Sequence, residues 1–158
     1  MDFDTAFDLL IGHEGGYSFN AADPGGETMW GITARVARAN GYGGSMRFMP
    51  RDTAKVIAKQ AYWDAVQADK IPDALRFDVF DGAYNSGTAQ SIKWMQRAVG
   101  VTDDGVFGPA TLKALQNADP ILTAKRYNGN RLQFMTNLAT WGVFGKGWAR
   151  RIAENLLK

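Results

Sequence analysis

Residues 3–16 read FDTAFDLLIGHEGG, a segment in which apolar side chains recur at the three- and four-residue spacing of an α-helix. Acidic residues occupy its first turn, where the positive end of the helix dipole favours them. Gly15 and Gly16 end the pattern, so we predict an amphipathic helix with Glu14 at its carboxyl end. The helix dipole favours a base over an acid at that end, and we therefore expect the pKa of Glu14 to be raised.

Further helical patterns follow along the chain, separated by glycine, proline and turn sequences. We predict helices over residues 34–40, 51–66, 74–86, 88–99, 109–117 and 120–139. Thr33 and Asp119 are suited to cap two of them. We place a last, amphipathic helix around Ile152 and Leu156, after a segment that contains Gly142, Gly145 and Gly147.

The strand signal is weak along the whole chain. Residues 17–32 are rich in turn residues and lack a sustained period, so we interpret them as a functional loop in which a short β-hairpin would fit. The predicted fold class is therefore mainly α.

The composition is that of one globular domain, or of one domain with two lobes. The chain has 158 residues, of which 46% are apolar and 22% are charged. It contains no cysteine and one histidine, His13. These counts argue against zinc sites built from several His or Cys ligands, and against Cys-His and Ser-His-Asp hydrolases. We expect no metal ion and no other cofactor.

Charge is unevenly distributed between the two halves of the chain. Residues 1–80 carry 8 basic and 11 acidic side chains, whereas residues 81–158 carry 10 and 5. A basic half suits a polyanionic partner such as cell wall, nucleic acid or a membrane surface, and a solvated face without a partner is an equal alternative. Because the basic residues are dispersed and no nucleic-acid-binding motif accompanies them, we expect no nucleic-acid partner.

Glu14 and Asp23 are the candidates for paired carboxyl chemistry. Inverting glycoside hydrolysis needs one protonated acid and a second, ionised carboxylate that activates water across the sugar. Glu14 follows an apolar helix face, where partial burial would keep it protonated, and Asp23 lies in a polar loop. From the pattern alone, Glu14 is equally well explained as a solvated acid, and Asp23 is better explained as part of an ordinary Asp-Pro-Gly-Gly turn.

Several motifs occur in an order that resembles one enzyme family. They are HEGGY at 13–17, DPGGET at 23–28, WGIT at 30–33, FDGAYNSG at 80–87, QRAVG at 96–100 and DGVFGPATL at 104–112. Together they resemble the glycoside hydrolase family 108 muramidases of phage endolysins and prophage genes, followed by the start of a peptidoglycan-binding region. The resemblance implies a lysozyme-like helical fold of two lobes with a catalytic cleft. It also implies a catalytic region at 1–86 and a helical peptidoglycan-binding region at 87–158, packed as one compact unit.

The resemblance also implies roles for individual residues. The glutamate of the family's Glu-Gly-Gly-Tyr motif is the catalytic acid, which implies Glu14, and the implied reaction is inverting hydrolysis of the β-1,4 bond between N-acetylmuramic acid and N-acetylglucosamine. T-even phage lysozymes, which the family resembles, separate a Glu from an Asp by eight residues and that Asp from a Thr by five. Here Glu14 and Asp23 keep the first spacing, but four residues separate Asp23 from Thr28. We predict that Asp23 holds the water with help from Thr28, and Glu27 is the alternative carboxylate.

Four further residues are candidates for binding the glycan. The resemblance places Tyr17, Trp30 and Tyr84 to stack on sugar rings or to wall the cleft, although aromatic residues at such positions are more often core. Asn85, flanked by aromatic and small residues on a buried helix, must satisfy its amide, and an N-acetyl group is a natural partner.

Other functions stay open at this point. A lytic transglycosylase would use Glu14 alone and would release anhydro products. A non-catalytic wall-binding or secretion-assisting module would keep the fold without the activity.

The two ends of the chain suggest how the protein meets the cell envelope. The C-terminal segment with Trp148, Arg150, Arg151, Ile152, Leu156, Leu157 and Lys158 is suited to anionic outer-membrane lipid or, alternatively, to docking on the core as a terminal helix. The N-terminus is acidic and shows no secretory leader. We therefore expect a monomer that stays in the cytoplasm, with antimicrobial action once a membrane-permeabilising holin of a phage lysis system releases it to the periplasm.

Overall fold

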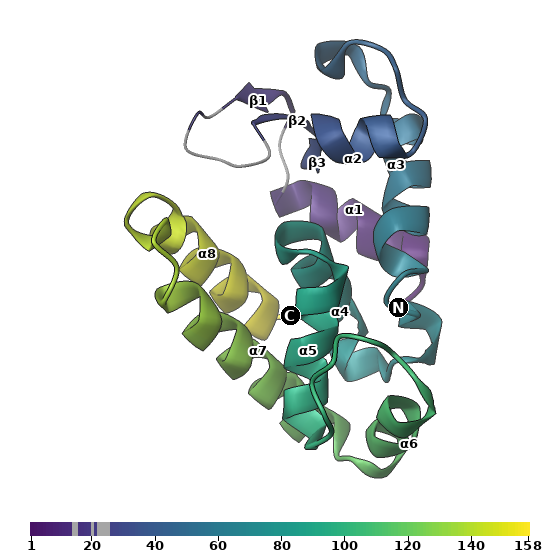
Figure 1. Cartoon of the computed structure of the whole chain (residues 1–158), viewed down its shortest axis with the longest axis vertical. Helices are drawn as coiled ribbons and strands as arrows, with labels where there is room; N and C mark the ends of the chain where they lie inside the picture. The colour runs from purple at the N-terminus through teal and green to yellow at the C-terminus, as the bar shows by residue number, and fades with distance from the viewer. Residues whose placement is uncertain (14–15, 20, 22–25) are drawn as a thin grey trace. The chain divides into compact units, whose positions relative to one another are not determined.

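The computed structural model describes residues 1–13, 16–19, 21 and 26–158. The chain forms two compact units, Met1–Ala65 and Val66–Lys158, and helices are the main elements of both (Figure 1). The predicted mainly α class is therefore confirmed. None of the described helices is long and apolar enough to cross a lipid bilayer.

The first unit contains two longer helices, α1 (Phe3–His13) and α3 (Arg51–Ala58). The apolar stripe predicted for α1 faces the core, where three of its side chains are fully buried: Ala6, Phe7 and Leu10. Phe3 meets Trp63 edge-on, with 5.5 Å between the ring centroids. Trp63 lies in a π-helical turn, η2 (Lys59–Trp63), that continues α3. The helix predicted over 51–66 is thus observed as an α-helix that widens before it ends.

A small antiparallel sheet lies between α1 and α2 in the sequence. Its strands are β1 (Ser18–Phe19), β2 (Glu27–Met29) and β3 (Ile32–Thr33), in that order. Met29 pairs with Ile32 across a two-residue turn, Trp30-Gly31, whose φ angles are 54° and 76°. Two positive φ angles define a type I′ turn, whose twist matches that of the flanking strands. The short β-hairpin predicted near residues 17–32 is confirmed.

Two short helices complete the first unit. Thr33 caps α2 (Ala34–Ala39), because its hydroxyl accepts a hydrogen bond from the Val36 backbone N–H at 3.2 Å. This confirms the predicted cap. A 3-10 turn, η1 (Met46–Phe48), follows and contacts β2.

The second unit is a cluster of helices around α4 (Asp73–Ser86), which follows the 3-10 turn η3 (Ala68–Lys70). The other α-helices described in this unit are α5 (Thr88–Val99), α6 (Pro109–Asn117), α7 (Pro120–Thr136) and α8 (Trp141–Leu156). α5 and α7 pack on α4 and on each other, α6 packs on α5, and α8 packs on α7 (Figure 1). The functional division predicted at residue 86 stays a prediction, and α4 itself belongs to the second unit.

The structure corrects the predicted start of the last helix. α8 begins at Trp141 rather than after Gly147, so all three glycines of this segment are helical. Gly145 is buried, and a Cβ atom there would collide with the Trp141 indole. Trp141 also contacts Trp148, with 6.1 Å between the ring centroids. This packing stabilises a helix that glycine's low helix propensity opposes.

Candidate active site

Two predicted catalytic residues, Glu14 and Asp23, lie outside the described residues. The elements next to them in the sequence are described: α1 ends at His13, and the small sheet carries Tyr17, Glu27, Thr28 and Trp30 on or beside its strands. The geometry of the sheet therefore bears on whether Asp23 or Glu27 is the second carboxylate beside Glu14.

Glu27 and Thr28 point to opposite faces of the sheet, because successive side chains of a strand alternate. Thr28 is paired in register with Ser18 on β1 and with Thr33 on β3. The hydroxyl oxygens of Thr28 and Ser18 are 2.8 Å apart, which marks a hydroxyl-lined face. Glu27 is paired with Phe19 and shares the other face with it. The side chains of Glu27 and Thr28 therefore leave β2 on opposite sides of the sheet.

Glu27 is engaged by a neighbouring tyrosine. The Tyr17 hydroxyl donates a hydrogen bond to the Glu27 carboxylate, and this bond is the main cause of a raised pKa of Tyr17. The Arg47 guanidinium lies over the Tyr17 ring, 4.1 Å from its centroid, and opposes that rise. Arg47 comes from η1, and the sequence analysis missed it because no pattern links a residue 30 positions away to this tyrosine. One face of the Tyr17 ring thus stacks on a cation.

Trp30 is held in an unfavourable backbone conformation. A positive φ is uncommon for a bulky residue and costs roughly 1–2 kcal/mol. The indole Nε1–H donates a hydrogen bond to the Met49 carbonyl at 2.9 Å, which ties the hairpin turn to the segment after η1. Strained residues of this kind cluster at functional sites. The half-buried Trp30 side chain is therefore fixed in place while part of it stays accessible.

Tyr84 and Asn85 lie in the last turn of α4, in the second unit. Tyr84 is 6% exposed and meets Phe80 edge-on at 6.0 Å, so the core uses most of its ring. Asn85 is half-buried, and its Oδ1 atom accepts hydrogen bonds from the Ser86 hydroxyl at 3.3 Å and from Arg131 at 3.4 Å. Asn85 keeps a polar group at the surface, whereas Tyr84 offers little ring area to a sugar.

A buried charge cluster lies beneath Asn85, and the sequence analysis did not predict it. Asp81 of α4 is fully buried and accepts hydrogen bonds from Arg131 at 2.7 Å, Arg151 at 2.8 Å and Asn155 at 2.9 Å. Burial alone would raise the pKa of Asp81, but the two guanidinium groups outweigh it and hold the pKa well below its usual range. The carboxylate is thus ionised inside the protein.

Asp78 lies one helical turn before Asp81, and among the described residues no guanidinium group donates a hydrogen bond to it. It is 8% exposed, and its Oδ2 atom accepts a hydrogen bond from the Asn128 amide at 3.0 Å. Burial raises the pKa of Asp78 to about 6 and the negative charge of Asp81 adds to the rise, although the Asn128 hydrogen bond and the charges of Arg131 and Lys158 oppose it. Two acids on one helix therefore differ in their preferred charge state because their partners differ.

The C-terminal helix uses part of its basic face inside the protein. Arg151 is bound to Asp81, and Ile152 is buried. The Lys158 ammonium lies 4.3 Å from the centroid of the Phe77 ring. Fewer cations are therefore available to lipid headgroups than the sequence suggests, and lipid binding by this helix stays a prediction.

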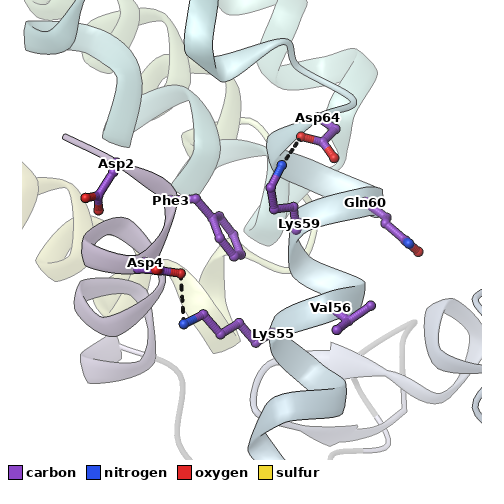
Figure 2. A pocket seen from close by; sticks show the side chains of 8 residues that line it. All are labelled: Asp2, Phe3, Asp4, Lys55, Val56, Lys59, Gln60 and Asp64. Carbon is purple, nitrogen blue, oxygen red and sulfur yellow. Dashed lines mark hydrogen bonds and ion pairs between the residues drawn. The ribbon is translucent and has the colours of Figure 1, made fainter.

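A pocket of about 660 Å³ in the first unit is lined by α1 and the α3–η2 segment (Figure 2). Its lining residues are Asp2, Phe3, Asp4, Lys55, Val56, Lys59, Gln60 and Asp64. Both lysines are ion-paired: Lys55 lies 2.8 Å from Asp4, and Lys59 lies 2.6 Å from Asp64. These described lining residues include none of the predicted site residues.

Comparison with known families decides where this chain belongs. Residues 7–87, half of the chain, match the glycosyl hydrolase 108 family. The chain belongs to this family. The glycosyl hydrolase 108 segment spans the predicted Glu14 and Asp23, the small sheet and all of α4. The family predicted from the sequence motifs is confirmed.

A second family match overlaps the end of the first. Residues 73–115 match a putative peptidoglycan binding domain, which confirms that the chain has a peptidoglycan-binding region, whereas its predicted bounds of 87–158 stay a prediction. The overlap of the two matches covers α4, whose residues therefore contribute to both.

Among the described residues, no group of three or more His, Cys, Asp or Glu side chains is arranged to hold a metal ion.

Two known proteins resemble this member of the glycosyl hydrolase 108 family. The structure of Brucella abortus SagA superposes with a TM-score of 0.90 and 32% sequence identity, over 97% of this chain and 90% of SagA. The N-acetylmuramoyl-L-alanine amidase CwlL of Bacillus licheniformis is 49% identical over 35 residues, which are 22% of this chain. The match spans only 10% of the length of CwlL. The likeness to SagA thus covers the whole fold, whereas the likeness to CwlL covers a short segment.

Proposed function

We propose that this protein is a peptidoglycan hydrolase that cleaves the β-1,4 bond between N-acetylmuramic acid and N-acetylglucosamine. The observation that carries the proposal is the family match over residues 7–87, which includes Glu14, followed by the peptidoglycan-binding match over 73–115. The glycoside hydrolase match indicates that the reaction is cleavage of a glycosidic bond, and the peptidoglycan-binding match indicates that the substrate is peptidoglycan.

In the proposed mechanism Glu14 is the general acid. Its carboxyl group protonates the glycosidic oxygen as the bond to the muramic acid breaks, while a second carboxylate removes a proton from the attacking water on the opposite face of the sugar. The water oxygen bonds to the anomeric carbon, and the sugar alcohol leaves. The configuration at that carbon is therefore inverted.

Asp23 is our choice for the second carboxylate, with Glu27 as the alternative. Glu27 already accepts the hydrogen bond of Tyr17 and lies on the face of β2 opposite to Thr28. If Asp23 activates the water, Thr28 can help to orient that water, because Glu27 lies on the opposite face of β2 and does not hydrogen-bond to the Thr28 hydroxyl from there. These contacts support Asp23 with Thr28 over Glu27 with Thr28.

The test is digestion of purified peptidoglycan by the wild-type protein and by Glu14→Gln, followed by borohydride reduction and mass spectrometry of the released muropeptides. We expect the wild-type protein to release reducible fragments that end in muramic acid. The rate of release by Glu14→Gln should be lower by a factor of at least about 100, as expected for the loss of a general acid. Anhydromuramic products would identify a lytic transglycosylase instead, and release of peptides without glycan cleavage would identify an amidase. No release by folded wild-type protein would leave a binding module.

Two matched variants distinguish the candidate carboxylates. We expect Asp23→Asn to lower the rate of glycan cleavage about 100-fold, because the general base is lost, and Glu27→Gln to keep it within a few-fold. The opposite ranking would assign the water to Glu27. Proton NMR of the freshly released reducing ends shows whether the anomeric configuration is inverted.

A further inference from the structure

Asn85 and Arg131 connect the surface of α4 to the buried charge cluster. Arg131 is fully buried on α7, and its NH1 group donates to Asp81 at 2.7 Å while its NH2 group donates to Asn85 Oδ1 at 3.4 Å. One guanidinium group therefore binds an interior carboxylate and a half-buried amide at the same time.

This contact fixes which end of the Asn85 amide faces inward. A guanidinium group has five N–H donors and no acceptor, so the atom that faces it must be the amide oxygen. The Ser86 hydroxyl donates to the same oxygen at 3.3 Å. The Asn85 Nδ2 group consequently points away from both donors, and among the described residues it has no acceptor.

The guanidinium itself cannot turn away easily. Its partner Asp81 is also held by Arg151 and by Asn155, and both Asp81 and Arg131 are excluded from solvent. Rotating Arg131 would leave a buried carboxylate with less compensation, which is costly in a protein interior. The orientation of Asn85 is therefore imposed by a rigid network rather than by solvent.

We propose that Arg131 is a positioning residue that turns the Asn85 amide so that it presents an N–H donor to the substrate, and that this donor selects the carbonyl oxygen of an N-acetyl group on the glycan. This inference rests on the proposed function, since it assigns a group of the proposed glycan substrate to Asn85. An amide in the opposite orientation would present an acceptor, which the carbonyl oxygen of an acetamide cannot satisfy.

The test measures binding rather than turnover. Glu14→Gln protein, with and without Asn85→Asp, is titrated calorimetrically with peptide-free peptidoglycan glycan strands and with the same strands after N-deacetylation. Asn85→Asp keeps an oxygen toward Arg131 but removes the outward donor, so the thermal midpoint should be unchanged or higher. We expect roughly tenfold weaker binding of the acetylated strands, and a preference for acetylated strands that disappears or reverses.

An unchanged preference in Asn85→Asp would overturn the inference, as would an equal loss of affinity for both kinds of strand. Arg131→Lys provides the second measurement, because lysine keeps the charge beside Asp81 but cannot reach two partners with a planar fork. In folded Arg131→Lys protein we expect the acetyl preference to fall, and a retained preference would contradict the positioning role. Glycan cleavage by the wild-type protein is scored separately, so failure of the proposed reaction is distinguishable from failure of this inference.

Discussion

Replacing Asp78 by asparagine should stabilise the protein at neutral pH. The carboxyl group is 8% exposed and has one described hydrogen-bond donor, the Asn128 amide. Burial raises its pKa from 3.8 to about 6, so ionisation at pH 7 is costly in the folded state. Asparagine has nearly the same shape and can still accept the Asn128 hydrogen bond, but it never acquires the charge.

The size and sign of the effect follow from linkage. A group whose folded pKa lies above its unfolded pKa stabilises the fold fully below the unfolded value, and this stability is lost as the pH rises through the folded value. A difference of about two units at about 1.4 kcal/mol per unit gives about 3 kcal/mol. Asp78→Asn should therefore match the wild type near pH 3.5 and exceed its unfolding free energy by about 3 kcal/mol above pH 7.

Urea unfolding curves at a series of pH values between 3.5 and 8 measure this difference directly. Asp52→Asn is the matched control, because it removes the same charge from an exposed position on α3. This substitution at an exposed position should not reproduce the gain of about 3 kcal/mol above pH 7. A constant difference between Asp78→Asn and the wild type at all pH values would refute the assignment of a buried acid whose burial outweighs its favourable partners.

Two further outcomes are expected from the described contacts. Gly145→Ala should lower the unfolding free energy by about 1–3 kcal/mol, because the new methyl group meets the Trp141 ring. Gly142→Ala on the same helix has open space and should raise it by about 0.5–1 kcal/mol, so thermal unfolding of the pair separates packing from helix propensity. Glu27→Gln should lower the pKa of Tyr17 toward its usual value, since the hydrogen-bonded carboxylate raises it. Ultraviolet titration of the phenol measures this pKa, and an unchanged, raised pKa in the variant would contradict the prediction.

Local sequence signals predicted much of the fold. The apolar spacing of α1 and the caps at Thr33 and Asp119 are properties of neighbouring residues, and the structure has them where the sequence indicates. The start of α8 was predicted wrongly because glycine-rich sequence argues against a helix locally. Packing of Trp141 over Gly145 reverses that preference, and packing is not visible in a local pattern.

The sequence motifs predicted which residues are candidates for the site, but not the contacts that these residues make. Family motifs identified Glu14, Asp23 and Thr28 as candidates, but the contacts that bear on their roles join distant parts of the chain. Arg131 reaches Asn85 across 46 positions, and Arg47 reaches Tyr17 across 30. Such pairs depend on how helices and strands pack, and no spacing rule within one element predicts them.

The cluster of Asp81, Arg131 and Arg151 has a consequence for how this protein can diverge. One carboxylate binds two guanidinium groups inside the second unit, so replacing Asp81 by an uncharged residue leaves two cations without the carboxylate that pairs with them, a loss of about 3–5 kcal/mol. A domain has about 5–15 kcal/mol of stability in total. Related chains that lack the aspartate should therefore have exchanged both arginines for uncharged residues, and the order of substitution is constrained: the aspartate is the last of the three that neutral drift can replace.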